Sequence, residues 1–286
     1  METPSIISGG DVLPQTTVRI RAGDANDPGI MHLGTGYLYN IESTSGTLPL
    51  VVSNRHVLCG KSWISLDMRI CGRDGLPLLD RTLPIHLDAS EAIVIAHPDD
   101  NVDLAVVCLA HFVQRVEEAG RFAYWPRGQE SFDLDSDTLR HISVTEAIFM
   151  VGYPNGIYDD VHGLPIIRRG TLATPYQVDF KGKKEFVVDV AAFPGSSGSP
   201  IFAVRERVDP TAGRGAWHRE THLTLLGFLS SGFTISLDGK IGSQPIPTSD
   251  AYGAGAQMLH LGICVKANRL EEIVNFIKSN PDQALA

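Results

Sequence analysis

The sequence has few cysteines, no surplus of basic residues and no long apolar run. Its 286 residues include only four cysteines and no CxxC pair, which argues against a disulfide-dense scaffold. The net charge of −9 argues against a nucleic-acid partner or an anionic membrane surface, because either would require a basic face. No stretch of about eighteen apolar residues occurs, so we expect no membrane-spanning helix.

A secretory signal is also missing from the first residues, Met-Glu-Thr-Pro-Ser, which have neither a basic nor an apolar region. With the low cysteine content, this leads us to expect a reduced, cytoplasmic setting. The first fifteen or so residues are interrupted by glycine and proline and are expected to form an arm. We expect no metal site and no cofactor, because neither a glycine-rich phosphate loop nor a complete metal-ligand motif occurs.

Short β-like runs bounded by turn residues fill most of the chain. Those of the first half are at 18–21, 36–41, 50–53, 64–66, 92–96 and 104–109. Those of the second half are at 144–151, 166–173, 185–190, 201–204, 223–229 and 261–265. A polar stretch without clear periodicity, 117–139, separates them and is expected to be a linker. Two six-strand sets predict an all-β protein of two packed six-stranded antiparallel barrels, 17–116 and 140–267.

One helix is predicted at the end of the chain, over 268–279. Its apolar residues fall at i, i+3, i+4 and i+7 and form one stripe, namely Leu270, Ile273, Val274 and Ile277. Asn268 stands where an N-cap is expected, with Glu271 three residues later, in the pattern of a capping box. We expect this helix to dock on a barrel.

A glycine- and serine-rich turn between apolar segments is the strongest candidate for chemistry. It reads Ala-Ala-Phe-Pro-Gly-Ser-Ser-Gly-Ser-Pro-Ile-Phe over 191–202. A serine held between glycines can expose its hydroxyl while neighbouring N–H groups converge on one point, as acyl transfer requires. The alternative is a plain surface turn, since Gly, Ser and Pro are common turn residues. Ser197 is the candidate nucleophile and Ser199 its rival.

A nucleophilic serine needs a base and an acid that orients it, and two strand ends offer them. His56 directly follows the apolar run 50–53, and Asp103 directly precedes the apolar run 104–109. Each has a plainer interpretation, as a strand-end or turn residue. Together with Ser197 they occur in the order His, Asp, Ser, separated by 47 and 94 residues.

The chain resembles a chymotrypsin-fold, trypsin-like serine peptidase, closest to the HtrA-type and other bacterial trypsin-like peptidase domains, without a PDZ domain. The resemblance covers about residues 17–267, and chymotrypsin-type enzymes have similar separations of roughly 45 and 93 residues. The segments that carry it are Gly-Thr-Gly-Tyr-Leu at 34–38, Ser-Asn-Arg-His-Val at 53–57, Asp-Leu-Ala at 103–105 and Asp-Val-Ala-Ala-Phe-Pro-Gly-Ser-Ser-Gly-Ser-Pro at 189–200. It implies a single peptidase domain over 1–286 that acts on protein or peptide substrates.

The resemblance also implies residue roles. Ser197 would be the nucleophile, His56 the general base and Asp103 the residue that orients it. The N–H groups of Gly195 and Ser197 would form the oxyanion hole. Substrate would be bound by Ala191, Ala192, Ser230, Ser231 and Gly232, with Gly262 or Cys264 opposite.

One position departs from the secreted digestive relatives, which carry an aspartate before the nucleophile. Here the residue is Ser196, so activation by an ion pair with a new N-terminus is not expected. We hypothesise instead that rearrangement of the loop 193–197 gates the enzyme. No carboxylate is expected at the base of the specificity pocket, so an apolar residue of small to medium size is predicted before the cleaved bond.

Two alternatives to a free peptidase remain open. The fold could serve as a peptide- or partner-binding module with catalysis suppressed, although the presence of all three residues argues against this. The chain could also be a regulated protease subunit of a stress or defence assembly, or a homo-oligomer. The sequence does not distinguish these possibilities.

Overall fold

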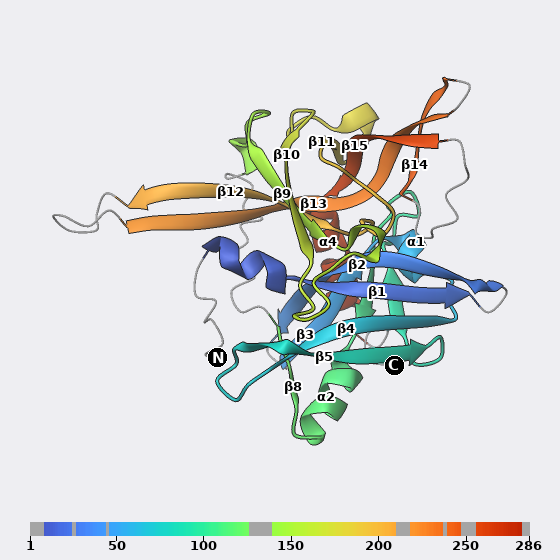
Figure 1. Ribbon diagram of the computed structural model, residues 1–286, viewed down its shortest axis with the longest axis vertical. Helices are drawn as coiled ribbons and strands as arrows, with labels where there is room; N and C mark the ends of the chain where they lie inside the picture. Colours follow the sequence, from blue (N-terminus) through green and yellow to red (C-terminus); the bar gives the residue numbers. More distant parts are fainter. Residues whose placement is uncertain are drawn as a thin grey trace.

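The structure is a computed structural model that describes residues 9–24, 27–43, 46–125, 139–209, 218–236, 239–246 and 256–281 (Figure 1). It is mostly β, with a sheet from each half of the chain and a helix near the C-terminus. The first sheet has eight strands. Their order is β5 (Pro77–Asp88), β4 (Trp63–Cys71), β1 (Thr17–Asp24), β2 (Asp27–Ser43), β3 (Gly46–Ser53), β7 (Ala105–Cys108) and β6 (Ile93–Ala96), with β8 (Phe122–Ala123) paired to β4.

The second sheet closes on itself, because its first strand also pairs with its sixth. The order is β12 (Pro200–Asp209), β9 (Ala147–Gly152), β10 (Ile166–Leu172), β11 (Glu185–Asp189), β15 (Ala256–Lys266) and β13 (His218–Ser236), which returns to β12. A seventh strand, β14 (Ile241–Pro245), is hydrogen-bonded to β13 outside this ring. β12 and β13 also extend together as a long two-stranded ribbon that projects from the body (Figure 1).

The prediction of two closed six-stranded barrels is therefore only half right. The second half forms a closed six-strand barrel with one added strand, whereas no pairing among the described residues joins the outer strands of the first sheet. The first sheet also contains β5, which the sequence pattern does not indicate. β5 begins at Pro77 and contains Pro84, and neither proline has an N–H, so β5 suits the sheet edge and lacks the usual β signature.

The short helical elements were not predicted. They are α1 (Arg55–Leu58), α2 (Ala110–Glu118) and the 3₁₀ turns η1 (Gly9–Gln15), η3 (Pro154–Gly156) and η4 (Phe180–Gly182). The expected N-terminal arm is wrong where the chain is described, since Leu13 is 3% exposed and belongs to the core. The expected linker begins within α2, and residues 126–138 of it lie outside the described residues.

The C-terminal helix is confirmed as α4 (Asn268–Ser279), and it packs where the two halves meet. Its stripe is buried in one cluster with residues of both sheets, among them Tyr37 and Val52 of the first and Phe202 and Phe228 of the second. The capping box is wrong: the N-cap is Ala267, and no side chain caps the helix. Apolar packing therefore holds α4 in place, and α4 packs against the junction of the two sheets, on which the candidate site depends.

Truncating this stripe should destabilise the protein. Replacing Ile273 by Ala leaves a cavity at a fully buried position and should lower the free energy of unfolding by about 2–5 kcal/mol, measured by urea denaturation. Asn275→Ala, on the exposed face of the same helix, is the control and should change it by no more than about 0.5 kcal/mol. Equal losses in both variants would contradict the packing role.

Candidate active site

His56 and Asp103 are brought together by the pairing of β3 with β7. Ser53 lies opposite Ala105, so the segments that follow β3 and precede β7 are neighbours at one sheet end. The Asn54 side chain donates to the Asp103 carbonyl over 2.8 Å and fixes that junction. His56 Nδ1 lies 2.7 Å from Asp103 Oδ2, and the His56 backbone N–H donates to Asp103 Oδ1 over 3.1 Å. His56 is therefore held by both carboxylate oxygens of Asp103, one bonded to its ring and one to its backbone N–H.

Asp103 is kept ionised by its hydrogen bonds. Burial disfavours the charged form and would raise the pKa of Asp103, but the hydrogen bonds from His56 and Ser230 outweigh it, so the pKa lies below its ordinary value. The Ser230 hydroxyl donates to Asp103 Oδ2 over 2.7 Å. We expected Ser230 on the substrate-binding edge, and its contact with the carboxylate was not foreseen.

Ser197 completes the arrangement from the second half of the chain. Its Oγ lies 3.1 Å from His56 Nε2, on the opposite side of the ring from Asp103. The three predicted residues thus form one hydrogen-bonded chain across the junction of the two sheets. The rival, Ser199, is fully buried and its hydroxyl donates to Thr35 Oγ1 over 3.2 Å.

The segment before Ser197 forms a tight turn. The Ser196 N–H donates to the Phe193 carbonyl over 3.0 Å, and between them stand Pro194 and Gly195, the latter at φ +83°. Proline followed by a residue of positive φ is the sequence of a type II turn. Ser196, where digestive relatives carry an aspartate, is fully buried within this turn.

The Pro194 carbonyl accepts a hydrogen bond from the Asn155 N–H, and this sets the orientation of the next peptide. Because a trans peptide places its C=O and N–H on opposite sides, the Gly195 N–H points away from Asn155. Asn155 itself adopts φ +50°, a left-handed conformation that asparagine tolerates better than most residues. Asn155 was not among the predicted site residues, although the Pro-Asn-Gly sequence at 154–156 is a turn signal.

Thr35, on β2 of the first sheet, forms hydrogen bonds with the segment 193–197, which we call the nucleophile turn. Its hydroxyl donates to the Gly195 carbonyl over 3.1 Å and accepts from the Tyr153 N–H over 3.2 Å. Its backbone N–H donates to the Ser197 carbonyl over 2.8 Å, and its own carbonyl accepts from the Ser53 hydroxyl over 2.7 Å. Thr35 is fully buried, so these bonds act in a low-dielectric setting where polar groups are costly to leave unpaired.

The remaining predicted residues lie in the segment before Ser197 and on two strands of the second sheet. Ala192 is fully buried in the apolar core of the barrel, whereas the Ala191 carbonyl accepts a hydrogen bond from Arg168 over 3.1 Å. Gly232 on β13 pairs with Gly262 on β15. The edge formed by Ser231 and Gly232, which we expected to be free for substrate, is paired with β14.

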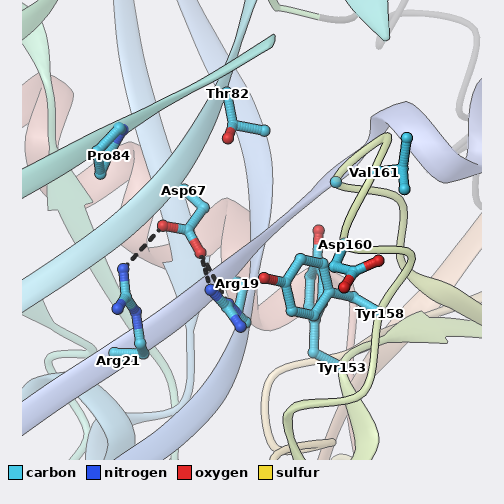
Figure 2. Close-up of a pocket in the computed structure, with 10 residues that line it drawn as sticks. Arg19, Arg21, Asp67, Thr82, Pro84, Tyr153, Tyr158, Asp160 and Val161 are labelled. Carbon is cyan, nitrogen blue, oxygen red and sulfur yellow. Dashed lines mark hydrogen bonds and ion pairs between the residues drawn. The ribbon is translucent and has the colours of Figure 1, made fainter. Parts of the chain in front are cut away.

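A hollow of about 290 Å³ lies between the first sheet and the loop 153–163 that follows β9 (Figure 2). Figure 2 shows Asp67 between Arg19 and Arg21, and both arginines form ion pairs with it, at 2.6 and 2.9 Å. The Arg19 guanidinium also stacks on the Tyr158 ring, 4.0 Å from its centroid. These contacts tie the loop to β1, and the same loop carries Asn155.

Comparison with known proteins decides the family. The family described as trypsin-like peptidase domain matches residues 34–208, more than half of the chain. The chain belongs to this family. A trypsin-like peptidase domain acts on protein or peptide substrates, and the matched range includes His56, Asp103 and Ser197. No match is found among curated proteins.

Solved structures with the chymotrypsin-like fold are similar to this trypsin-like peptidase domain. The active form of the Rv3671c protease from M. tuberculosis is 15% identical, with a TM-score of 0.46 over 96% of this chain and 91% of that one. The thermostable serine protease AL20 from an extremophilic microorganism is 12% identical, with a TM-score of 0.45 over 93% and 98%. The scabies mite inactivated protease paralogue S-I1 is 14% identical, with a TM-score of 0.37 over 74% and 90%.

Two further properties hold for the part of the chain that the structure describes. Among these residues, no helix is long and apolar enough to cross a membrane. Nor do three or more His, Cys, Asp or Glu side chains gather there in a way that could hold a metal ion.

The turn geometry predicts the effect of a methyl group at Gly195. Gly195→Ala would strain the positive φ and place a Cβ 2.6 Å from the Tyr153 carbonyl oxygen. Backbone strain alone should lower the free energy of unfolding by about 1–2 kcal/mol, and the contact with Tyr153 should increase this loss. Gly182→Ala is the control, because Gly182 has φ +76° and open space around its Cβ position. Urea denaturation measures both, and equal losses would show that the contact with Tyr153 is unimportant.

The Ser230 hydrogen bond predicts a pH-dependent effect on stability. A carboxylate whose pKa is lowered by folding stabilises the protein above its unfolded pKa, about 3.9, and this contribution is lost as the pH falls through the folded value. Ser230→Ala removes a hydrogen bond that lowers the pKa of Asp103. It should therefore lower the free energy of unfolding by about 1–3 kcal/mol at pH 7, and by less as the carboxylate protonates. Ser199→Ala, which removes a bond between hydroxyls, should show no such trend in urea denaturation.

Proposed function

We propose that the chain is a serine endopeptidase that acts through an acyl-enzyme, and that 1–286 forms one peptidase domain. The observation that carries this proposal is the continuous hydrogen-bonded chain from Asp103 through His56 to Ser197, at 2.7 and 3.1 Å. These separations are within the range that proton transfer requires.

Each residue has a distinct role in the proposed reaction. Ser197 Oγ attacks the substrate carbonyl carbon while His56 Nε2 accepts its proton, and ionised Asp103 stabilises the resulting imidazolium. The tetrahedral oxyanion is stabilised by the N–H groups of Gly195 and Ser197. The orientation of the Pro194–Gly195 peptide supports this role for Gly195. His56 then protonates the leaving amine, and a water molecule, activated by the same imidazole, releases the acyl group.

Specificity is proposed to favour an apolar residue before the cleaved bond. Ala192 lies in an apolar cluster with Val190 and Met258, and such a lining favours an apolar side chain. A peptide library varied at this position should therefore give the fastest cleavage after apolar residues. A preference for Arg or Lys would contradict the proposal.

The alternative is a binding module with suppressed catalysis, and one observation supports the suppression. The edge of β13 that would receive a peptide is already paired with β14. Enzyme and module differ in whether Ser197 is required for product formation rather than for binding.

Two serine substitutions separate these possibilities. Ser197→Ala should lower peptide hydrolysis by about ten-thousand-fold or more and abolish labelling by a fluorophosphonate probe, because the nucleophile is removed. Ser199→Ala should leave peptide hydrolysis and probe labelling unchanged, because the Ser199 hydroxyl donates to Thr35 whereas His56 faces Ser197. Identical peptide products from a proteome digest with the parent protein and with Ser197→Ala would leave only the binding module.

A further inference from the structure

β14 lies on the edge of β13 that a peptide substrate would need. The two strands are antiparallel, with Gly232 opposite Gln244 and Ser231 opposite Pro245. This edge begins at Ser230, whose side chain contacts Asp103. β14 therefore runs toward the candidate catalytic residues as an added strand, which is a general way for an extended peptide to bind a sheet.

The residue after β14, Ile246, contacts the candidate catalytic centre itself. Its N–H donates to the Ser230 carbonyl over 3.1 Å and continues the pairing by one residue. Its carbonyl oxygen accepts from Ser197 Oγ over 3.1 Å. The backbone of Ile246 thus spans from the substrate edge to the hydroxyl of the candidate nucleophile.

The Ile246 side chain fills the apolar pocket beside the nucleophile. It is 1% exposed and belongs to the same buried cluster as Ala192, Val190 and Met258. Its Cγ1 lies 3.8 Å from the position that a Cβ on Gly232 would occupy. All five residues of β14 are exposed, so Ile246 is the one buried anchor of this segment.

From these contacts we propose that the segment 241–246 is a built-in substrate mimic that occludes the active site. This rests on the proposed function, because it assigns Ile246 to the position before the cleaved bond and Pro245 and Gln244 to the two preceding positions. Opening the site requires the segment to leave the edge of β13. The proposed inhibition thus lies at the substrate edge, while the nucleophile turn is already formed.

The sequence explains why the mimic would persist uncut. Ile246 is followed by Pro247, so the bond at the cleavage position is a tertiary amide. Its nitrogen carries a ring carbon in place of the hydrogen of an ordinary peptide, which crowds the side from which the leaving nitrogen must be protonated. The substrates that fit the same subsites are peptides with proline followed by a branched aliphatic residue, cleaved before a residue other than proline.

The test compares two aspartate substitutions in the full chain. Ile246→Asp places a charge in an apolar pocket and should displace the segment. Ile241→Asp makes the same change at the other end of β14, where the side chain is 66% exposed, and is the matched control. Fluorophosphonate labelling and hydrolysis of a Gln-Pro-Ile anilide should both be at least about tenfold faster in Ile246→Asp, because the competent fraction rises. Ile241→Asp should behave as the parent.

The outcomes separate this proposal from the proposed function. If the parent labels and hydrolyses as fast as Ile246→Asp, occlusion is overturned while the peptidase stands. If Ile246→Asp fails to fold by circular dichroism, Ile246→Gly, which removes the anchor without adding charge, replaces it with the same expected result.

A binding measurement tests occlusion even if no variant is active. In a Ser197→Ala background, a fluorescent Ser-Gln-Pro-Ile peptide amide should bind Ile246→Asp at least about tenfold more tightly than Ile241→Asp, measured by anisotropy. Equal affinity, or no binding to either variant, would overturn the substrate mimic. Tighter binding without hydrolysis in the active background would support occlusion and count against the peptidase.

Discussion

A single buried hydroxyl, that of Thr35, joins the two halves of the chain at the nucleophile. It holds the Gly195 carbonyl on one side and the Tyr153 N–H on the other, while the Thr35 backbone bonds to Ser197 and Ser53. Because these groups are excluded from water, each would be costly to leave unpaired, so the turn and the strand constrain each other. His56 follows Ser53 closely, and the same network therefore sets the position of the base relative to the nucleophile.

The nucleophile turn is preorganised, whereas the edge along which a substrate would reach it is occupied by β14. The Asn155 N–H holds the Pro194 carbonyl and the Thr35 hydroxyl holds the Gly195 carbonyl, so the orientation of the turn does not depend on a bound ligand. The substrate edge, in contrast, is covered by a segment that buries only Ile246. A rigid site with a weakly anchored cover differs from a site that must be assembled, since only the cover has to move. The hypothesis of a rearranging loop at 193–197 remains a prediction.

The residues of the candidate site that could be predicted are those whose signal is local. His56, Asp103 and Ser197 each adjoin a buried strand, so the sequence indicates both their places at strand ends and their order. Ser230 was assigned only to the substrate edge, because its contact with Asp103 joins residues 127 apart and depends on how two sheets pack. β14, with Gly, Ser, Gln and Pro in five residues, lacks the apolar alternation that marks a strand.

The fold was predicted to a similar extent and for similar reasons. Strands with apolar alternation were found, as was the helix whose stripe has a clear period. That only one of the two sheets closes could not be predicted, because closure depends on pairings between residues distant in sequence, such as β12 with β13. Asn268 illustrates the limits of a cap motif: tertiary packing begins the helix one residue earlier than its side chain would favour.

The attachment of β14 to the chain at both ends has a thermodynamic consequence. An occupant tethered in this way acts at an effective concentration set by its connecting segments, commonly in the millimolar range, and not by the amount of protein present. Dilution would not release it, and a free peptide would have to exceed this local concentration or bind more tightly than a strand with one buried side chain. Such a peptidase would thus discriminate by substrate affinity before any bond is cleaved.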